Sequence, residues 1–401
     1  MAEEGGSVKV RFVSPWYPDY ALVHSGIFVA KQVAAVRELG HDVTVDVPQI
    51  FPAPSGPIPK QVTESMRSLA SRSRDAMFAT RDGVTYVPTP VPSRGGSMGR
   101  AEAMANSLSL LAEFRDDAPD VIHAHLGMPT AWAVSQTDRN VSLVVTEHQS
   151  TLSSVFAEPP ATDAYAEVVR RADAFICVSD HLRDQIADGV GDWARDRIEV
   201  IPNIVDLAEI SFVERPDPEF HSWIYIGGLM AHKGVQTLLR TFAEYVKRHD
   251  EDASLTLVGD GPLRGWIQAF ATTRGFSDSV RLTGSVPHDQ LGAHLARADV
   301  MVHLSPAETF GIAPLEGIGS GLPVVCLRNA GAVNSWGDLE RECGLLVPLD
   351  ASPVEIAEAI SRLRRSGDQL DAVAGRQAVL DRFAPHVVAK RLVETYTRVL
   401  R

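Results

Sequence analysis

Two glutamates separated by seven residues form the most suggestive chemical pattern in the sequence. Glu308 and Glu316 lie in the stretch SPAETFGIAPLEG, between two apolar runs of strand length, ADVMVHLS and GLPVVCL. Pro314 suits the first position of a short helix, which would place Glu316 in the first turn and make Gly321 the stop. Glu308 would therefore follow the carboxyl end of a strand directly.

The carboxyl end of a parallel strand is where open α/β sheets bind ligands. The free amides of a helix start favour an anion there, and carboxylates accept hydrogen bonds from hydroxyl groups. A phosphate beside a polyol would use both features. The same pair of glutamates would also suit an exposed helix face, so the neighbouring motifs have to decide between the two interpretations.

Further motifs place glycine, lysine and histidine after other strand-like runs. Glycines let the backbone approach a phosphate closely. None of the motifs is a Walker loop or a G-x-G-x-x-G fingerprint, which argues against a kinase-type nucleotide loop and against a dinucleotide enzyme. The residues of these motifs are Ser25 and Gly26 at a helix start, His123 and His125 in DVIHAHLG, and Gly227, Gly228 and Lys233 in IGGLMAHKGV. The stretch LVGDGPLR adds a third glycine-rich turn between a strand and a helix.

The composition is that of an α/β enzyme. The chain has 401 residues and 45% hydrophobic content, and its strand-like runs alternate with helix-length segments, which predicts parallel sheets covered by helices. A net charge of −13 argues against general nucleic-acid binding. Three separated cysteines fit buried reduced thiols, and no signal peptide or membrane span is indicated. We therefore expect a cytoplasmic protein with at most peripheral membrane association.

Residues 53 to 105 interrupt the alternation of strands and helices. They are rich in proline and arginine, and we expect a long loop or a short helical insertion there. The segment is either a solvated surface or a recognition element for an anionic acceptor or a membrane surface. Its arginines are Arg67, Arg72, Arg74, Arg81, Arg94 and Arg100.

In this order and spacing, the motifs resemble glycosyltransferase family four, the retaining GT-B enzymes that use nucleoside-diphosphate sugars. The resemblance covers essentially the whole chain and includes TEHQS, CVSDHLRDQI, VIPNIVDL, RLTGSVPHDQL, GLPVV and GLLVPLD, with the glutamate pair as its most specific motif. It implies an α/β GT-B fold with two Rossmann-like domains that face a central cleft. We expect an acceptor-binding domain over residues 1–205, a donor-binding domain over 206–383, and a terminal helix over 384–401 that packs back on the first domain.

The resemblance also implies roles for single residues. Glu316 would accept the ribose hydroxyls, Glu308 would cradle the donor sugar, and Lys233 would stabilise charge on the departing diphosphate. His125 corresponds to the inter-domain histidine that meets the acceptor or donor sugar, and its alternative is a satisfied core histidine. The implied catalytic set is His125, Lys233 and Glu308; the donor set adds Ser25, Gly26, Gly227, Gly228, Arg281, Thr309, Phe310, Gly311 and Glu316, and the acceptor set is His123, His125 and His148.

The implied mechanism uses neither a metal nor another cofactor, because Lys233 takes the place of the metal cation. The D-x-D match at Asp250 to Asp252 lies in a polar run before a strand, which predicts a solvated turn. In a front-face mechanism the leaving phosphate can accept the proton of the acceptor hydroxyl. A dedicated base is then not required.

Two positions depart from the family's pattern. Gly228 stands where the family has an arginine, so one of two usual diphosphate cations is missing. A lost buried charge-assisted bond costs about 1.5 to 3 kcal/mol if nothing replaces it, and His232 and Arg264 are candidate substitutes. The stretch NAGAVNSW, from Asn329, stands where the family commonly has paired glycines and a downstream acid.

We therefore predict a glycosyltransferase that moves a hexosyl group from a nucleoside-diphosphate sugar, with a UDP-sugar favoured and a GDP-sugar next. The acceptor would be a hydroxyl of a small molecule, a saccharide or a lipid-linked compound. The alternatives are a GT-B-fold sugar-nucleotide epimerase or phosphorylase and, because of Gly228, a catalytically weak nucleotide-sugar binding protein. The sequence leaves the acceptor and the oligomeric state open.

Overall fold

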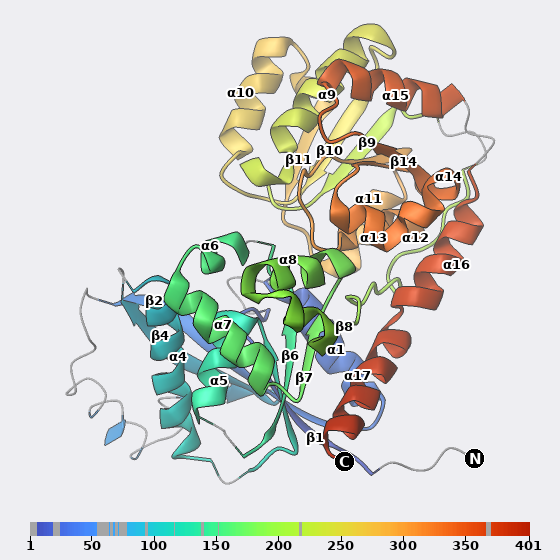
Figure 1. Ribbon diagram of the computed structural model, residues 1–401. Helices are drawn as coiled ribbons and strands as arrows, with labels where there is room; N and C mark the ends of the chain where they lie inside the picture. Colours follow the sequence, from blue (N-terminus) through green and yellow to red (C-terminus); the bar gives the residue numbers. More distant parts are fainter. Residues whose placement is uncertain are drawn as a thin grey trace, which may run out of the picture. The chain divides into compact units, whose positions relative to one another are not determined.

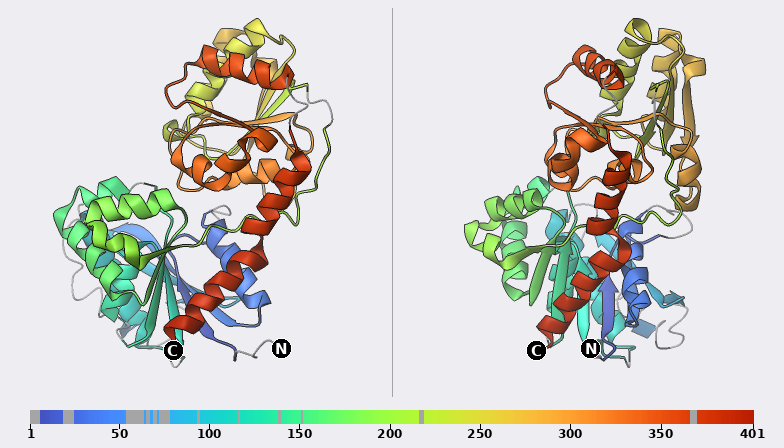
Figure 2. Two further views of the ribbon diagram at one scale, coloured as in Figure 1. Left: turned by 45° about the vertical axis from the view of Figure 1, so that its right-hand side comes forward. Right: turned by 90° about the vertical axis from the view of Figure 1, so that its right-hand side faces the viewer.

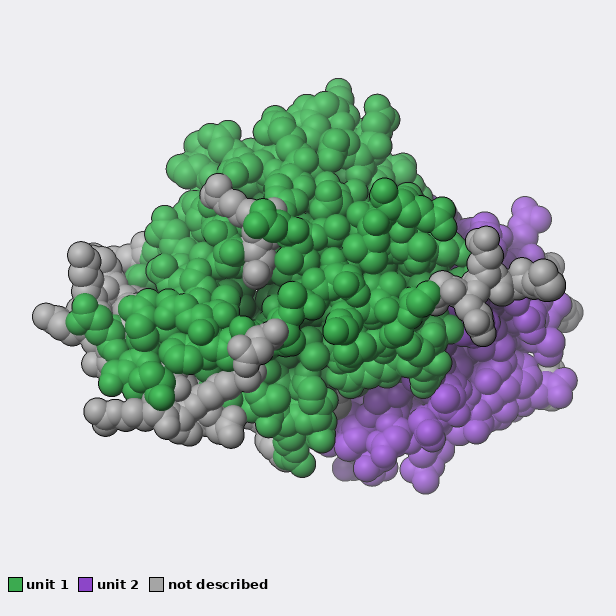
Figure 3. Space-filling view, turned by 90° about the horizontal axis from the view of Figure 1, so that it is seen from below, with its two compact units in different colours: residues 1–202, 388–401 green, residues 203–387 purple. Residues whose placement is uncertain are grey.

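The chain forms two compact units, each built on its own sheet. The computed structural model describes residues 6–18, 25–53, 64, 67–68, 71, 78–92, 95–115, 117–137, 140–150, 152–215, 219–365 and 370–401. The first unit comprises Met1–Pro202 with Val388–Arg401, and the second comprises Asn203–Val387 (Figure 3).

The sheet of the first unit has eight strands in the order β3-β4-β2-β1-β5-β6-β7-β8, and only β3 runs antiparallel to its neighbour. All residues of the central strand β5 are buried, as is typical of a parallel sheet with helices on both faces (Figure 1). Its two histidines therefore lie in the core. The strands are β1 (Lys9–Val13), β2 (Asp42–Ala53), β3 (Ala79–Arg81), β4 (Val84–Pro92), β5 (Val121–His125), β6 (Ser142–Glu147), β7 (Ala174–Cys177) and β8 (Ile198–Val200).

The terminal helix α17 (Pro385–Val399) belongs largely to the first unit and runs beside its sheet (Figure 2). Arg391 donates a hydrogen bond to the carbonyl oxygen of Val200 at the end of β8, at 2.6 Å, and Tyr396 is fully buried. The other helices of this unit are α1 (Ile27–Glu38), α4 (Gly96–Ala112), α5 (Trp132–Thr137), α6 (Leu152–Phe156), α7 (Pro159–Arg171) and α8 (Asp180–Val190).

The expectation of a loop or short helical insertion over residues 53 to 105 was wrong for its second half. Residues 84–92 form strand β4, which pairs with β2 along its whole length, and α4 begins at residue 96. Three prolines at alternate positions, Pro88, Pro90 and Pro92, disguise the strand. Because the prolines alternate, their missing N–H groups share one side of the strand. Among the described residues, β3 pairs only with residues 84–86, so no described strand needs N–H donors from the proline positions on that side.

The arginines of this segment have mixed surroundings. Arg67 forms two hydrogen bonds with the carboxylate of Glu113, at 2.8 and 2.7 Å, on an exposed surface. Arg72, Arg74 and Arg94 lie outside the described residues.

The sheet of the second unit has six parallel strands in the order β11-β10-β9-β12-β13-β14. On one face α9 (Val235–Arg248) and α15 (Pro353–Arg365) lie side by side (Figure 1). They cover a core that contains Trp223, Phe242 and Tyr245. The strands are β9 (Ser222–Ile226), β10 (Ser254–Val258), β11 (Val280–Gly284), β12 (Val300–His303), β13 (Val324–Leu327) and β14 (Gly344–Val347), and the other helices are α10 (Arg264–Arg274), α11 (His288–Leu295), α12 (Ile312–Gly319), α13 (Ala330–Trp336), α14 (Glu340–Cys343) and α16 (Ala372–Phe383).

Candidate active site

The loop that follows β9 carries the glycine pair and the lysine of the candidate donor site. The Tyr225 hydroxyl donates a hydrogen bond to the carbonyl oxygen of Gly228 at 3.0 Å and so holds the loop against the strand that precedes it. A Cβ atom added at Gly228 would meet only Met230, at an ordinary contact distance of 3.6 Å. Position 228 therefore has room for the start of a side chain. A short 3-10 turn then brings Lys233 to the start of α9.

Lys233 and Glu308 form an ion pair. The Lys233 ammonium donates to both carboxylate oxygens of Glu308, at 2.8 and 3.0 Å. The Nε2 atom of His303, the last residue of β12, lies 3.3 Å from the Oε1 atom of the same carboxylate. The exposed fractions of the three side chains are 27% for Lys233, 13% for Glu308 and 6% for His303, so water screens these contacts little.

The two neighbours keep Glu308 ionised. Burial by itself would raise the pKa of this carboxyl group, but the hydrogen bonds and charges of His303 and Lys233 outweigh burial and lower the pKa to about 2. Burial, with a further contribution from the Glu308 charge, raises the pKa of Tyr225. Glu308 is therefore a carboxylate that can accept, but not donate, a hydrogen bond at neutral pH.

Glu316 is buried in helix α12, which begins after Gly311. The expected helix start was wrong by two residues: the helix begins at Ile312, Pro314 is its third residue, and Glu316 lies beyond the first turn. Proline is tolerated there because the first turn of a helix uses no N–H donor. The Oε1 atom of Glu316 lies 2.9 Å from Nε2 of His288, the first residue of α11.

The NAGAVNSW stretch, which departs from the family's pattern, packs against the backbone of the loop that contains Glu308. The Asn329 side chain accepts a hydrogen bond from the Ala332 amide, which caps α13, and donates one to the carbonyl oxygen of Ser305, at 2.9 Å each. A Cβ atom at Gly331 would lie 2.6 Å from the carbonyl oxygen of Glu308. Only glycine lets α13 approach the Glu308 backbone this closely.

In the first unit, Ser25 and Gly26 lie at the start of α1, as the sequence predicts. Gly26 has a φ of 65°, and a Cβ atom there would overlap the carbonyl oxygen of Trp16. Glycine is required at this position because the loop after β1 passes so close to the helix start.

The three candidate acceptor histidines lie close together: His123 is in the middle of β5, His125 is its last residue, and His148 directly follows β6. Both ring nitrogens of His123 have internal partners, the Tyr396 hydroxyl at 2.8 Å and the Thr146 hydroxyl at 2.7 Å. The Nδ1 atom of His125 lies 2.9 Å from Nε2 of His148, and the two rings stack at 5.2 Å between centroids. Because Tyr396 and Thr146 occupy both ring nitrogens of His123, this residue has no nitrogen left for a ligand, and its role is structural.

His125 has a different environment from His123. Its Nε2 atom is buried and has no hydrogen-bond partner among the residues that the structure describes. Burial is the main cause that lowers the pKa of His125 well below its ordinary value, and the neighbouring histidines add to the effect. The imidazole is therefore neutral, and its Nε2 atom is buried with its hydrogen-bonding capacity unused among the described residues.

Sequence reasoning missed Glu147, which orders the backbone around these histidines. One of its carboxylate oxygens accepts from the amides of His148 and Gln149, at 2.8 Å each. The other accepts from the Gly127 amide and the Tyr165 hydroxyl, at 2.9 Å each. The TEHQS motif contains Glu147, His148 and Gln149, but Gly127 and Tyr165 come from separate segments that the sequence alone does not bring together.

Arg281 does not join the donor residues at the strand ends. It is the second residue of edge strand β11, it is exposed, and it lines a groove beside α10. The other donor residues of the second unit follow the carboxyl ends of β9 and β12. The candidate substitute cation Arg264 is paired with Asp260, with Nη1 and Oδ2 3.6 Å apart.

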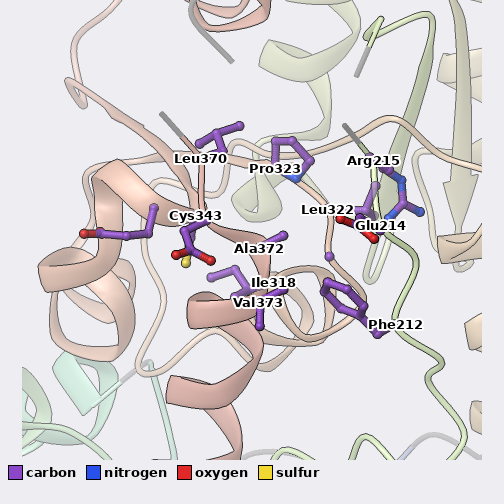
Figure 4. A pocket seen from close by; sticks show the side chains of 13 residues that line it. Phe212, Glu214, Arg215, Ile318, Leu322, Pro323, Cys343, Leu370, Ala372 and Val373 are labelled. Carbon is purple, nitrogen blue, oxygen red and sulfur yellow. The ribbon is translucent and has the colours of Figure 1, made fainter. Parts of the chain in front are cut away.

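A cavity of about 280 Å³ lies in the second unit (Figure 4), and its lining includes none of the candidate donor residues. It is lined by residues that precede β13, including Leu322 and Pro323, and by Cys343. Burial raises the pKa of the Cys343 thiol to about 12, so this thiol is not a nucleophile at neutral pH.

Three further observations bear on the class of site. The cysteines Cys177, Cys326 and Cys343 are buried and unpaired, as expected. Within the described ranges, no group of three or more histidine, cysteine, aspartate or glutamate side chains is arranged to hold a metal ion. The helices described here include none with both the length and the apolar character to cross a membrane.

Comparison with known proteins identifies the class. Residues 25–209 match the family model for Glycosyltransferase Family 4, and residues 221–366 match the model for Glycosyl transferases group 1. A glycogen synthase of Mycobacterium tuberculosis is 26% identical over 417 residues, which span 98% of this chain and 95% of that protein. A GDP-mannose-dependent phosphatidylinositol monomannoside mannosyltransferase of Mycolicibacterium smegmatis is 28% identical over 59% of this chain and 65% of its own length.

The fold comparison agrees with the sequence comparison. The sucrose-phosphate synthase of Thermosynechococcus elongatus superposes with a TM-score of 0.73 over 97% of this chain and 98% of its own, at 17% identity. The chain belongs to glycosyltransferase family four and has the two-domain α/β GT-B fold. It is a glycosyltransferase.

Proposed function

We propose that this glycosyltransferase is a retaining, metal-independent enzyme that transfers a hexosyl group from a nucleoside-diphosphate sugar to a hydroxyl group. The observation that carries the proposal is the Lys233–Glu308 ion pair beside the start of α12, with Glu316 in the same helix. This arrangement offers a cation to a diphosphate and carboxylates to the hydroxyls of a sugar and a ribose.

In the proposed reaction, the bond between the sugar's anomeric carbon and the diphosphate oxygen breaks. A new bond to the acceptor oxygen forms on the same face, and the hydroxyl proton passes to the leaving phosphate. Negative charge builds up on the diphosphate, where Lys233 stabilises it, while Glu308 faces the positive charge that develops on the sugar. Lys233 thereby supplies the charge that a metal provides in other transferases.

The donor is proposed to be a UDP-sugar in the first instance and a GDP-sugar in the second. A GDP-mannose-dependent relative supports keeping GDP in the set. The acceptor is proposed to be a saccharide, a small molecule or a lipid-linked compound. We place the protein in the cytoplasm, which its unpaired cysteines support, with at most peripheral contact to a membrane.

A panel of sugar nucleotides tests the proposal directly. The protein is first screened for thermal stabilisation by UDP-, GDP- and ADP-sugars, since a ligand at 100 times its dissociation constant adds about 2.7 kcal/mol to the free energy of unfolding. Release of the nucleoside diphosphate is then measured with saccharide and lipid acceptors without added metal. We expect turnover, and NMR of the product should show the donor's anomeric configuration; inversion would contradict the retaining mechanism.

Gly228 favours a second candidate function, a nucleotide-sugar binding protein with weak catalysis. The position lacks the arginine that the family uses as a second diphosphate cation. Calorimetric binding of a sugar nucleotide, together with no release of nucleoside diphosphate across the acceptor panel, would support this second function. Turnover without added metal would exclude it.

A further inference from the structure

His303 contacts the central carboxylate of the candidate donor site, although no sequence motif points to it. Its ring is stacked on the ring of Tyr225, with 5.2 Å between centroids and 10° between planes. Tyr225 is itself held by its hydrogen bond to the Gly228 carbonyl oxygen. The stack fixes the plane of the imidazole so that Nε2 faces Glu308.

The direction of the hydrogen bond follows from the chemistry of its two ends. Glu308 is ionised and can only accept, so the Nε2 atom of His303 must carry the hydrogen. The Nδ1 atom of His303 is buried and has no hydrogen-bond partner in the described part of the chain. An unsatisfied buried polar atom is costly, which suggests that the orientation of the ring serves the carboxylate.

His303 matters most for Glu308 when Lys233 binds its proposed ligand, the diphosphate of the donor. In the present structure two hydrogens of the Lys233 ammonium are directed at Glu308. Each phosphate oxygen that the ammonium then contacts competes with this carboxylate. His303 provides Glu308 with a donor that the diphosphate does not draw away.

We infer that His303 is a positioning residue that holds the Glu308 carboxylate toward the donor sugar when Lys233 engages the diphosphate. The inference rests on the proposed function. It assigns the contact with phosphate to Lys233 and the anchoring of Glu308 to His303. It also predicts that loss of His303 affects the sugar and not the nucleotide.

Two substitutions separate anchoring from packing. His303→Leu keeps a side chain of similar bulk but removes the donor, whereas His303→Gln keeps an N–H donor close to the position of Nε2. His386, an exposed residue of α17, provides the matched control His386→Leu. The affinities for UDP or GDP and for the matching sugar nucleotide are measured by calorimetry, and turnover is measured by release of the nucleoside diphosphate.

We expect His303→Leu to lower kcat about tenfold and to reduce the affinity gained from the sugar by a similar factor, which is the effect of one charged hydrogen bond. Affinity for the free nucleoside diphosphate should stay within about twofold of that of the wild type, and His303→Gln should recover most of kcat. The inference is overturned if Gln is as slow as Leu, if Leu equals the wild type, or if nucleotide affinity falls together with turnover. If the wild type binds no nucleoside diphosphate, the proposed function fails and takes the inference with it.

Discussion

Glu308 and Glu316 have different partners, and this difference should separate their roles in kinetics. Glu308 contacts Lys233 and His303, whereas Glu316 contacts His288. A group that binds the ribose acts equally before and during the reaction, whereas a group near the sugar acts mainly in the transition state. The two carboxylates should therefore respond differently to the same substitution.

We predict that Glu316→Gln weakens nucleoside diphosphate binding about tenfold with a smaller change in kcat, whereas Glu308→Gln lowers kcat by about a hundredfold. Glutamine keeps the shape of each side chain and removes its charge. Calorimetry with the nucleoside diphosphate and steady-state turnover measure the two effects. Equal changes in both constants for both variants would contradict the assignment.

We predict that Lys233→Ala costs at least about 2 kcal/mol of transition-state stabilisation, because it removes the cation nearest the proposed diphosphate.

Gly228→Arg tests whether the site is one cation short. The Cβ position at Gly228 meets only Met230, so the backbone admits the substitution. A guanidinium can bridge phosphate oxygens, so nucleoside diphosphate binding should tighten.

Turnover shows whether the space at Gly228 has another use. If a bulky acceptor or an unusual donor occupies it, Gly228→Arg should bind the free nucleotide and lose turnover. If Lys233→Ala changes neither affinity nor rate, the diphosphate does not lie at this lysine.

Residues in linear motifs were accessible from the sequence, and residues defined by tertiary neighbours were not. Glu308, Glu316 and Lys233 lie in short patterns whose spacing carries their meaning. His303 and Glu147 also lie in or beside quoted motifs, but their importance depends on partners from other strands and helices. Spacing along a chain does not report such contacts.

At the scale of elements, helix α13 limits where the Glu308 loop can lie. Gly331 leaves no room for a side chain between this helix and the Glu308 carbonyl oxygen. We predict that Gly331→Ala lowers kcat by about 10- to 100-fold, because a shift of about 1 Å in a catalytic group has an effect of that size. Turnover and circular dichroism of the purified variant measure the change and the integrity of the fold.

Gly337→Ala is the matched control, because a Cβ atom there would meet Val333 and Leu346 at ordinary distances of 3.6 to 3.8 Å. This variant should retain turnover. A Gly331→Ala variant that is as active as the control would show that the loop position is not tightly coupled to catalysis.

The strands and helices were predicted best where their patterns are simple. Buried parallel strands such as β5 and β12 appear as short apolar runs and were located from the sequence. Strand β4 was missed because its alternate prolines are usually taken as a loop signal. They are acceptable because, among the described strands, β3 covers only residues 84–86 and leaves the rest of β4 as an edge. Edge position is a property of the sheet and not of the segment.

At the scale of the whole molecule, the repeated alternation of strand and helix was enough to predict two α/β halves. Each half needs its own parallel sheet because the strands are apolar on both faces. The packing of the terminal helix depends on more than the apolar pattern of its sequence. Tyr396, from the end of the chain, donates to or accepts from His123 in the centre of the first sheet, which a periodic apolar pattern does not specify.

This buried contact makes the first unit sensitive to acid. Burial, with a smaller contribution from His148, lowers the pKa of His123 to about 3 from its ordinary value of 6.5. The unfolded chain therefore takes up a proton below about pH 6.5 that the folded chain does not. The contribution of His123 to the free energy of unfolding is constant above about pH 6.5. It falls by about 1.4 kcal/mol per pH unit as the pH decreases toward 3.

We predict that acidification from pH 7.5 to 4.5 lowers the free energy of unfolding of the first unit by about 3 kcal/mol through His123 alone. Hydrogen exchange of peptides from β5 and β6, corrected for the intrinsic effect of pH, measures this change. Other buried groups titrate as well, and burial raises the pKa of Glu147, which acts in the opposite direction. The difference between the wild type and His123→Gln isolates the histidine, because glutamine can bond to Tyr396 and Thr146 but takes up no proton. An equal loss of stability in the two proteins would mean that His123 does not control the acid response.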